Sequence, residues 1–289
     1  MDIGLIALFD GQPGNTLADA ARTAKHLEEN GFSGLWHPDH VVMFEQYAPK
    51  YPYSSDGVPQ LPPGNGWFDP LFVLAAAATT TTRLRLGTSI IILPERDPLV
   101  LAKQVATLDH LCGGRLDLGV GIGWSAEEYA ALGIPWERRG ARADEYIAAM
   151  RRLWQDLPAS YEGEFVSFHD VLAWPQPLQR PGPPIIVGGQ SPGALRRAAR
   201  HGDGWISWVL PVEEVGPTTN RLREECAAAG RDPAELRCVY GVPYTTPKEL
   251  QVYAEAVRQT GGELAVLPWV PGRNLLEVLD EVAEQRDLL

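Results

Sequence analysis

Asp39 and His40 are the adjacent side chains in this sequence best suited to moving a proton. They follow a short apolar segment, residues 32–37, that is typical of a buried strand. An imidazole changes its charge near neutral pH, so His40 is a candidate general acid or base. The sequence is equally consistent with a structural role, in which His40 bonds a loop carbonyl and Asp39 belongs to a turn after Pro38.

A second candidate site is the glycine-rich segment 121–126, Gly-Ile-Gly-Trp-Ser-Ala, which follows a predicted strand and opens a helix. It matches the dinucleotide-binding fingerprint. That fingerprint requires a further strand ending in an acid ~20 residues later. Asp144 and Glu145 instead fall inside a predicted helix. We therefore expect Gly121, Gly123 and Trp124 to border a flat ligand without forming a conventional nicotinamide site.

A third segment, Val187-Gly188-Gly189-Gln190-Ser191-Pro192, ends a strand and begins a helix. Backbone amides at a helix N-terminus attract anions, so this segment is a candidate phosphate site. The alternative is a tight turn in which glycine supplies a positive φ.

Aromatic residues accumulate near the predicted strand ends, and they either line a pocket for a ring system or fill the core. The tryptophans concerned are Trp36, Trp67, Trp124, Trp205 and Trp208. No His, Cys, Asp or Glu cluster has metal-ligand spacing, and no serine lies in a Gly-x-Ser-x-Gly elbow, so we expect neither a metal site nor a serine hydrolase.

The elements that position these residues alternate regularly between strand and helix. Predicted strands cover residues 3–9, 32–37, 84–93, 115–121, 185–187, 204–208, 236–242 and 264–267, and at least one helix follows each, the longest at 138–157 and the last at 274–286. Ser125 and Glu128 suggest a capping box. Eight such units predict an α/β fold, a single (β/α)8 TIM barrel over residues 1–289, with a doubly wound sheet as the alternative. Insertions at about 41–68 and 158–183 should cover the barrel mouth, where the strand ends converge.

Composition narrows the class of partner. The 289 residues carry 25 basic and 37 acidic side chains, a formal charge of −12, which argues against nucleic acid and anionic membranes. Three scattered cysteines suggest a reducing cytoplasm. The first residues read as a strand and not as a signal peptide, and no apolar run approaches the ~20 residues of a membrane helix.

Together these residues resemble the luciferase-like monooxygenase superfamily, in particular its branch that uses the deazaflavin coenzyme F420. The resemblance runs from Gly31 to about Trp208 and rests on ordered motifs: GFxxLWxPDH at 31–40, DPL at 69–71, RLGT at 85–88, AKQxATLD at 102–109, GGRLxLGVGxGW at 113–124 and VGGxSPxALRRAA at 187–199.

The resemblance implies a cis peptide bond between Ser89 and Ile90, whose bulge presses on the back of the cofactor ring. It implies a phosphate on Val187, Gly188, Gly189 and Gln190. Asp39 and His40 would then lie beside the reactive edge, with Gly121, Gly123 and Trp124 flanking the ring.

The sequence departs from the sugar-phosphate dehydrogenases of this family, which have Gly-Glu where Gly123-Trp124 stands. Their second acid is missing unless Glu127 or Glu128 replaces it. Equivalents of their basic residues for a substrate phosphate are also not evident. Both departures argue against a sugar phosphate as substrate.

We therefore expect an F420-dependent oxidoreductase that transfers a hydride between the deazaflavin C5 and a small organic substrate, with His40 as the catalytic residue. One alternative is a reduced-FMN monooxygenase supplied by a separate flavin reductase, just as an F420 reductase could serve the first. The other is a non-catalytic flavin-binding barrel. The family also suggests a homodimer.

Overall fold

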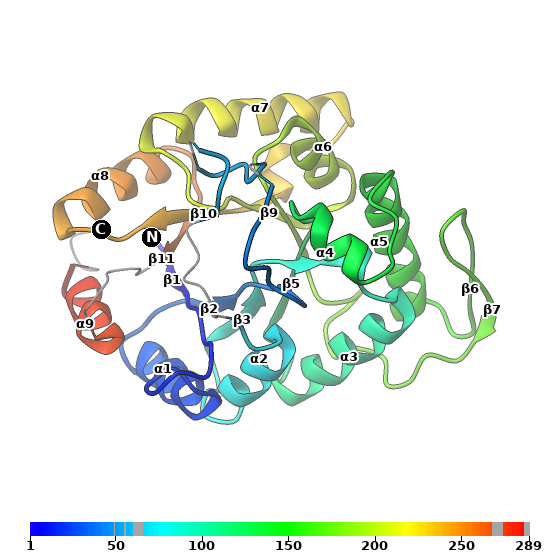
Figure 1. Ribbon diagram of the computed structural model, residues 1–289, viewed down its shortest axis with the longest axis horizontal. Coiled ribbons are helices and arrows are strands. Elements are labelled where there is room, and N and C mark those ends of the chain that lie inside the picture. Colours follow the sequence, from blue (N-terminus) through cyan, green and yellow to red (C-terminus); the bar gives the residue numbers. More distant parts are fainter. Residues whose placement is uncertain (49, 55, 60–65, 268–273, 286–289) are drawn as a thin grey trace.

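The computed structural model describes residues 1–48, 50–54, 56–59, 66–267 and 274–285. Its parallel strands form a ring with helices around the outside, viewed down the barrel in Figure 1. The order is β3-β2-β1-β11-β10-β9-β8-β5, and β3 pairs with β5, which closes the sheet. The predicted TIM barrel is therefore confirmed.

The barrel strands are short and almost fully buried. They are β1 (Ile3–Ile6), β2 (Gly34–His37), β3 (Arg85–Thr88), β4 (Ile91–Ile92), β5 (Leu116–Gly121), β8 (Ile185–Gly188), β9 (Gly204–Ile206), β10 (Arg237–Pro243) and β11 (Glu263–Leu267). The prediction of one strand over 84–93 is wrong in detail. The strand is interrupted at Ser89 and Ile90, and β4 resumes beside β5 before a 3-10 turn begins at Leu93.

The outer helices are α1 (Leu17–Glu29), α2 (Pro70–Ala78), α3 (Pro98–Leu111), α4 (Ala126–Ala131), α5 (Arg139–Gln155), α6 (Pro192–His201), α7 (Val215–Ala228), α8 (Pro247–Arg258) and α9 (Leu275–Gln285). Their starts follow local chemistry. Asp97 caps α3 by accepting bonds from the amides of Leu99 and Val100, and Pro98 occupies the first turn, where no amide is needed. Residue 286, the predicted end of the last helix, lies outside the described residues.

Two apolar clusters fill the barrel. The larger lies mainly between strands and helices, and the smaller includes Trp36, Ile186, Ile206 and Val239. Trp36 needs glycine neighbours, because a Cβ at Gly4 would lie 2.0 Å from its ring. Trp36 and Trp205 are therefore core residues, 1% and 0% exposed, so of the two alternatives for these tryptophans the core is the one that the structure shows.

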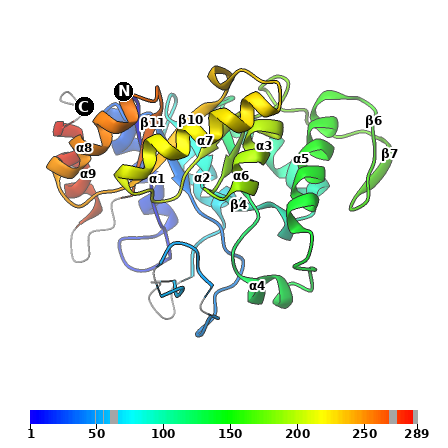
Figure 2. The same cartoon turned by 90° about the horizontal axis from the view of Figure 1, so that it is seen from above.

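The two insertions differ in where they lie relative to the barrel mouth. Residues of the first, including Tyr51, Tyr53 and Trp67, line the mouth, and Figure 2 shows this segment at the same end of the barrel as α4. The second forms a hairpin of β6 (Ala159–Glu162) and β7 (Ser167–Val171) outside the helix ring. None of its described residues lines the cavity, so the prediction that it covers the mouth is wrong.

Candidate functional site

A cavity of about 1640 Å³ opens at the carboxyl ends of the strands. It exceeds the roughly 300–1,000 Å³ of a typical small-molecule site, so it has room for two ligands together. The predicted site residues on its wall are Asp39, His40, Ser89, Ile90, Gly121, Gly123, Trp124, Gly188, Gly189 and Gln190. Val187 is fully buried in the core instead, so its side chain does not take part.

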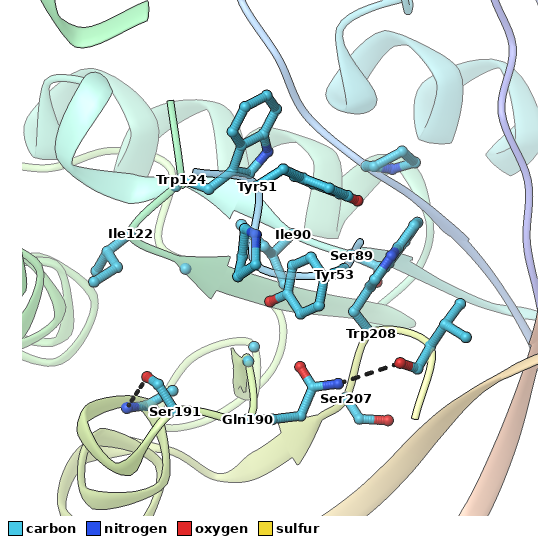
Figure 3. A pocket seen from close by; sticks show the side chains of 18 of the residues that line it. Tyr51, Tyr53, Ser89, Ile90, Ile122, Trp124, Gln190, Ser191, Ser207 and Trp208 are labelled. Atoms are coloured by element: carbon cyan, nitrogen blue, oxygen red, sulfur yellow. Dashed lines mark hydrogen bonds between the residues drawn. The ribbon is translucent and has the colours of Figure 1, made fainter. Parts of the chain in front are cut away.

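Ile90 forms a ridge on the cavity floor. The peptide bond between Ser89 and Ile90 is cis, as the resemblance implied, and the Ile90 side chain lies between the ends of β5 and β8 (Figure 3). A Cβ at Gly188 would lie 2.5 Å from Cγ2 of Ile90, and one at Gly121 would lie 2.6 Å from its Cδ1. These two glycines therefore make room for the ridge.

The loop after β8 offers fewer free amides than the sequence suggested. The Gly189 amide donates to the Ile206 carbonyl at 3.1 Å, and the Ala194 amide donates to Oγ of Ser191 at 3.2 Å. Gln190 contributes a different group. Its Nε2 donates to the Val209 carbonyl at 3.4 Å, while its buried Oε1 has no hydrogen-bond partner in the described part of the chain. This oxygen can accept a bond from a ligand N–H.

Arg139 is a cation of the cavity wall that the sequence reasoning missed. It begins α5, and its guanidinium carbon lies 3.5 Å from the centre of the Trp136 ring. Its Nε is buried and finds no hydrogen-bond partner among the described residues, and burial lowers the pKa of this guanidinium. Ser191 and Ala194, in the first turn of α6, lie on the same cavity wall. The arrangement is suited to an anion.

Asp39 is held by a buried ion pair. Its Oδ1 accepts from Nη2 of Arg96 at 2.7 Å, and its Oδ2 accepts from Nε of Arg96 and from the Ile92 amide. Arg96 also bonds Asp69 at 2.9 Å. Burial raises the pKa of Asp39, and the Arg96 charge opposes that shift. With both oxygens occupied, Asp39 is suited to joining the ends of β2 and β4.

His40 connects two polar partners. Its Nδ1 lies 2.6 Å from Oε2 of Glu128, and Nε1 of Trp124 donates to its Nε2 at 3.2 Å. An indole nitrogen only donates, so Nε2 must carry the lone pair and Nδ1 the proton. This assignment makes His40 a neutral imidazole with its acceptor nitrogen on the cavity side, next to Trp124.

Glu128 orients the histidine. Its Oε1 accepts from the amides of Val41 and Val42 at 2.6 and 3.2 Å, and it is 1% exposed. The suggested capping box is only half formed: Ser125 accepts from the Glu128 amide, but the Glu128 carboxylate turns to His40. Glu127 accepts from the Ala48 amide instead. Of the two acids considered as replacements, Glu128 is the one that contacts His40.

Behind this pair lies Glu95, which the sequence reasoning also missed. It is 9% exposed, and within the described ranges of the chain neither carboxyl oxygen has a hydrogen-bond partner. Burial raises the pKa of Glu95 to about 9, and the charges of Glu128 and Asp39 act in the same direction. At neutral pH its carboxyl is therefore protonated. No group of three metal-ligating side chains was found among the residues that the structure describes.

The luciferase-like monooxygenase family model matches residues 1–281. The chain belongs to this family. A Mycobacterium tuberculosis relative, named only as an uncharacterized protein, is 39% identical over 235 residues, which cover 80% of each chain. The solved structure of the monooxygenase RslO1 from Streptomyces bottropensis is 25% identical, has a TM-score of 0.78, and is matched over 100% of this chain and 99% of its own.

Relatives of this luciferase-like protein use two cofactors. An F420-dependent glucose-6-phosphate dehydrogenase of Intrasporangium calvum is 33% identical over 62% of this chain and 50% of its own. An FMNH2-dependent dimethylsulfone monooxygenase of Pseudomonas putida is 37% identical over 46% of this chain and 38% of its own. The family therefore establishes a luciferase-like oxidoreductase or monooxygenase. No helix among the described residues is both long and apolar enough to span a membrane.

Proposed function

We propose that this protein is an F420-dependent oxidoreductase in which the deazaflavin lies on the Ile90 ridge and His40 exchanges a proton with the substrate. The observation that carries the proposal is the ridge itself. Ile90 projects between Gly121 and Gly188, and the same cavity contains His40 and Trp124. A flat ring can therefore rest on the ridge with one face toward the floor and the other toward the mouth.

Two unpartnered polar atoms fit the rest of such a cofactor. Oε1 of Gln190 is an acceptor for an imide N–H at the edge of a deazaflavin or flavin ring, and Arg139 is a cation for its phosphate. When bound, a deazaflavin supplies hydride chemistry at C5. The remaining tasks belong to the protein: to bind the ring, to exclude water and to manage the proton.

The proton is assigned to Nε2 of His40. In the tautomer described above this nitrogen is an acceptor, so it can take a proton from a substrate hydroxyl as the hydride leaves the adjacent carbon. The imidazolium then formed is stabilised by the Glu128 carboxylate on Nδ1. In the reverse direction the same nitrogen returns the proton to a carbonyl oxygen.

A spectral titration tests the cofactor. Purified protein is mixed with oxidised deazaflavin and, in parallel, with FMN, and the absorbance change of each ring is followed. We expect tight binding of the deazaflavin and weak binding of FMN. Tight binding of FMN with none of the deazaflavin would overturn the proposal.

That outcome would favour a second function, a reduced-FMN monooxygenase supplied by a flavin reductase, which the Pseudomonas putida relative supports. Oxygen consumption with reduced FMN separates the two, because hydride transfer to a deazaflavin consumes no oxygen. Failure to bind either ring would leave a barrel without this chemistry.

We also propose a homodimer. Large apolar side chains remain exposed on the helical side of the barrel and on the second insertion, including Phe72, Val100, Leu172 and Trp174. Monomeric proteins rarely expose large contiguous apolar patches. Light scattering should give about twice the mass of one chain, and the monomer mass would contradict the proposal.

A further inference from the structure

The cavity holds a cluster of aromatic rings that begins beside the Ile90 ridge and extends into the first insertion. Tyr51 lies 4.9 Å from Trp124 and 5.4 Å from Tyr53, and Tyr53 lies 6.5 Å from Trp208, all between ring centres. These four side chains gather around Ile90 in Figure 3. Two come from the first insertion and two from loops after strands, so the cluster exists only in the folded barrel.

His40 is continuous with this cluster. Its ring centre lies 5.5 Å from that of Trp124 and 5.3 Å from that of Trp67. The polar contact between Nε1 of Trp124 and Nε2 of His40 therefore sits at an aromatic wall. A substrate hydroxyl that displaces this direct contact would accept from the indole and donate to the imidazole. A carbonyl oxygen would accept from the indole alone.

The wall is also electrically neutral. Burial raises the pKa of Tyr51 to about 12, so this phenol stays protonated at physiological pH, and the neighbouring Tyr53, which is 41% exposed, carries no charge of its own there either. The cations on the cavity wall are paired with other groups or lie away from these rings. Arg221 bonds Glu214 at 3.0 Å, Arg139 stacks on Trp136, and Lys50 is exposed. With Arg139 engaged by the cofactor phosphate, an ionised substrate among these rings would lose its hydration without gaining a close counter-charge.

From these observations we infer that the substrate is an uncharged, planar aromatic alcohol or the corresponding carbonyl compound. Its ring packs against Tyr51, Tyr53 and Trp208, and its oxygen displaces the direct contact between Trp124 and His40 to bond both. The inference rests on the proposed function for the fate of the electrons: the alcohol gives a hydride to the cofactor and a proton to Nε2 of His40, and becomes the carbonyl. The aromatic binding site itself does not depend on which cofactor is used.

Three probes separate the features of this class. Acetylnaphthalene is planar and neutral, naphthoate has the same rings with a negative charge, and cyclohexyl methyl ketone is neutral but not planar. Their dissociation constants are measured calorimetrically on the protein saturated with oxidised deazaflavin. We expect acetylnaphthalene to bind at least about tenfold more tightly than naphthoate, because the charge must be desolvated. We also expect it to bind more tightly than the cyclohexyl ketone, which cannot stack.

Matched variants locate the effect. Tyr51→Leu removes a ring but keeps apolar volume, and it should weaken acetylnaphthalene binding about threefold to tenfold. Tyr51→Phe retains the ring but loses the phenol's hydrogen bond with Trp208, so it should keep most of the affinity that Tyr51→Leu loses. Tyr161→Leu, on the distant hairpin where Tyr161 stacks on Phe168, is the control and should have no effect.

The outcomes distinguish this inference from the proposed function. If deazaflavin does not bind, the proposed function fails, and the ranking of the three probes on the Arg139→Met protein, whose cavity wall lacks this free cation, still decides the substrate class. Naphthoate binding as tightly as acetylnaphthalene would overturn the inference. So would equal binding by the cyclohexyl ketone, or a Tyr51→Leu protein that retains wild-type affinity while Tyr51→Phe confirms that the site is folded.

Discussion

Oε2 of Glu128 lies 2.6 Å from Nδ1 of His40, although 88 positions separate the two residues. Both side chains are nearly inaccessible to solvent, at 1% and 8% exposed. Oε1 of the same carboxylate is occupied by two backbone amides of the first insertion. Glu128 therefore connects α4, the candidate catalytic histidine and the segment that covers the mouth.

Replacing Glu128 with glutamine should reverse the histidine tautomer. The Val41 and Val42 amides need an acceptor, so the glutamine oxygen faces them and its NH2 group faces Nδ1. Nδ1 must then accept, and the proton moves to Nε2, where it opposes the Trp124 N–H. We expect kcat/KM to fall about a hundredfold to ten-thousandfold. Nitrogen NMR of the imidazole should report protonated Nε2.

Glu127→Gln is the control for this variant. Glu127 is adjacent in sequence but bonds the Ala48 amide, so its loss should leave the His40 tautomer unchanged. An Nδ1-protonated His40 in the Glu128→Gln protein would contradict the assigned arrangement, whatever the activity.

Asp39→Asn should destabilise the fold more than it perturbs any ligand directly. The substitution breaks the buried ion pair with Arg96 and leaves part of a guanidinium charge unpaired, although Asp69 remains as a partner. Breaking a buried ion pair costs about 3–5 kcal/mol. We expect the free energy of unfolding, measured in urea, to fall by about 3 kcal/mol. Asp156→Asn is the control. It removes an exposed ion pair with Arg152 and should change the free energy of unfolding by less than about 1 kcal/mol. Equal effects of the two substitutions would contradict this structural role.

The barrel was predictable because each strand-helix unit carries its own signals. Asp97 with Pro98 and Ser191 with Pro192 begin helices locally, and apolar strands need no distant information. Site residues that directly follow strands were predictable for the same reason, since the carboxyl ends of barrel strands converge. His40, Ile90 and Gly188 belong to this group.

Glu128 and Arg139 were harder to predict because tertiary structure selects their partners. The Glu128 carboxylate was expected to complete the capping box of α4, but it bonds His40 instead. Arg139 looked like one of two arginines at a helix start, and only the fold distinguishes it from Arg138, which is exposed and paired with Glu164. The second insertion was misplaced because alternation predicts that a hairpin forms and says nothing about where it lies.

Glu95 should make stability depend on pH. Its folded pKa of about 9 lies above the 4.5 that is usual for a glutamate carboxyl, so the folded state holds the proton more tightly. The contribution is fully present below the unfolded pKa and is lost as pH rises through the folded one. Glu95→Gln removes this dependence. Between about pH 5 and 9 the free energy of unfolding of the variant should therefore rise relative to that of the wild type, by up to a few kcal/mol. Urea unfolding across that range measures the free energy of unfolding of both proteins. If the two free energies change in parallel with pH, the prediction is wrong.

Gly188→Ala should weaken cofactor binding while the barrel remains folded. The added Cβ would lie 2.5 Å from Cγ2 of Ile90, so the ridge must move. We expect the deazaflavin dissociation constant to rise about tenfold or more, as a displaced core contact costs about 1–3 kcal/mol. Gly216→Ala in α7 is the control, because its Cβ would meet nothing within 4 Å. It should leave binding unchanged and stabilise the helix by about 0.5–1 kcal/mol.

Arg139→Met should weaken binding of the phosphate-bearing cofactor because the cavity wall loses an unpartnered cation. A hydrogen bond to a charged group contributes about 1.5–3 kcal/mol, so the dissociation constant should rise about tenfold to a hundredfold. Its dependence on salt should also weaken, since one charge contact is gone. Arg138→Met is the control, because Arg138 bonds Glu164 on the surface. It should change neither the dissociation constant nor its dependence on salt. If both variants bind alike, the anion lies elsewhere, and the first turn of α6 would have to hold it without Arg139.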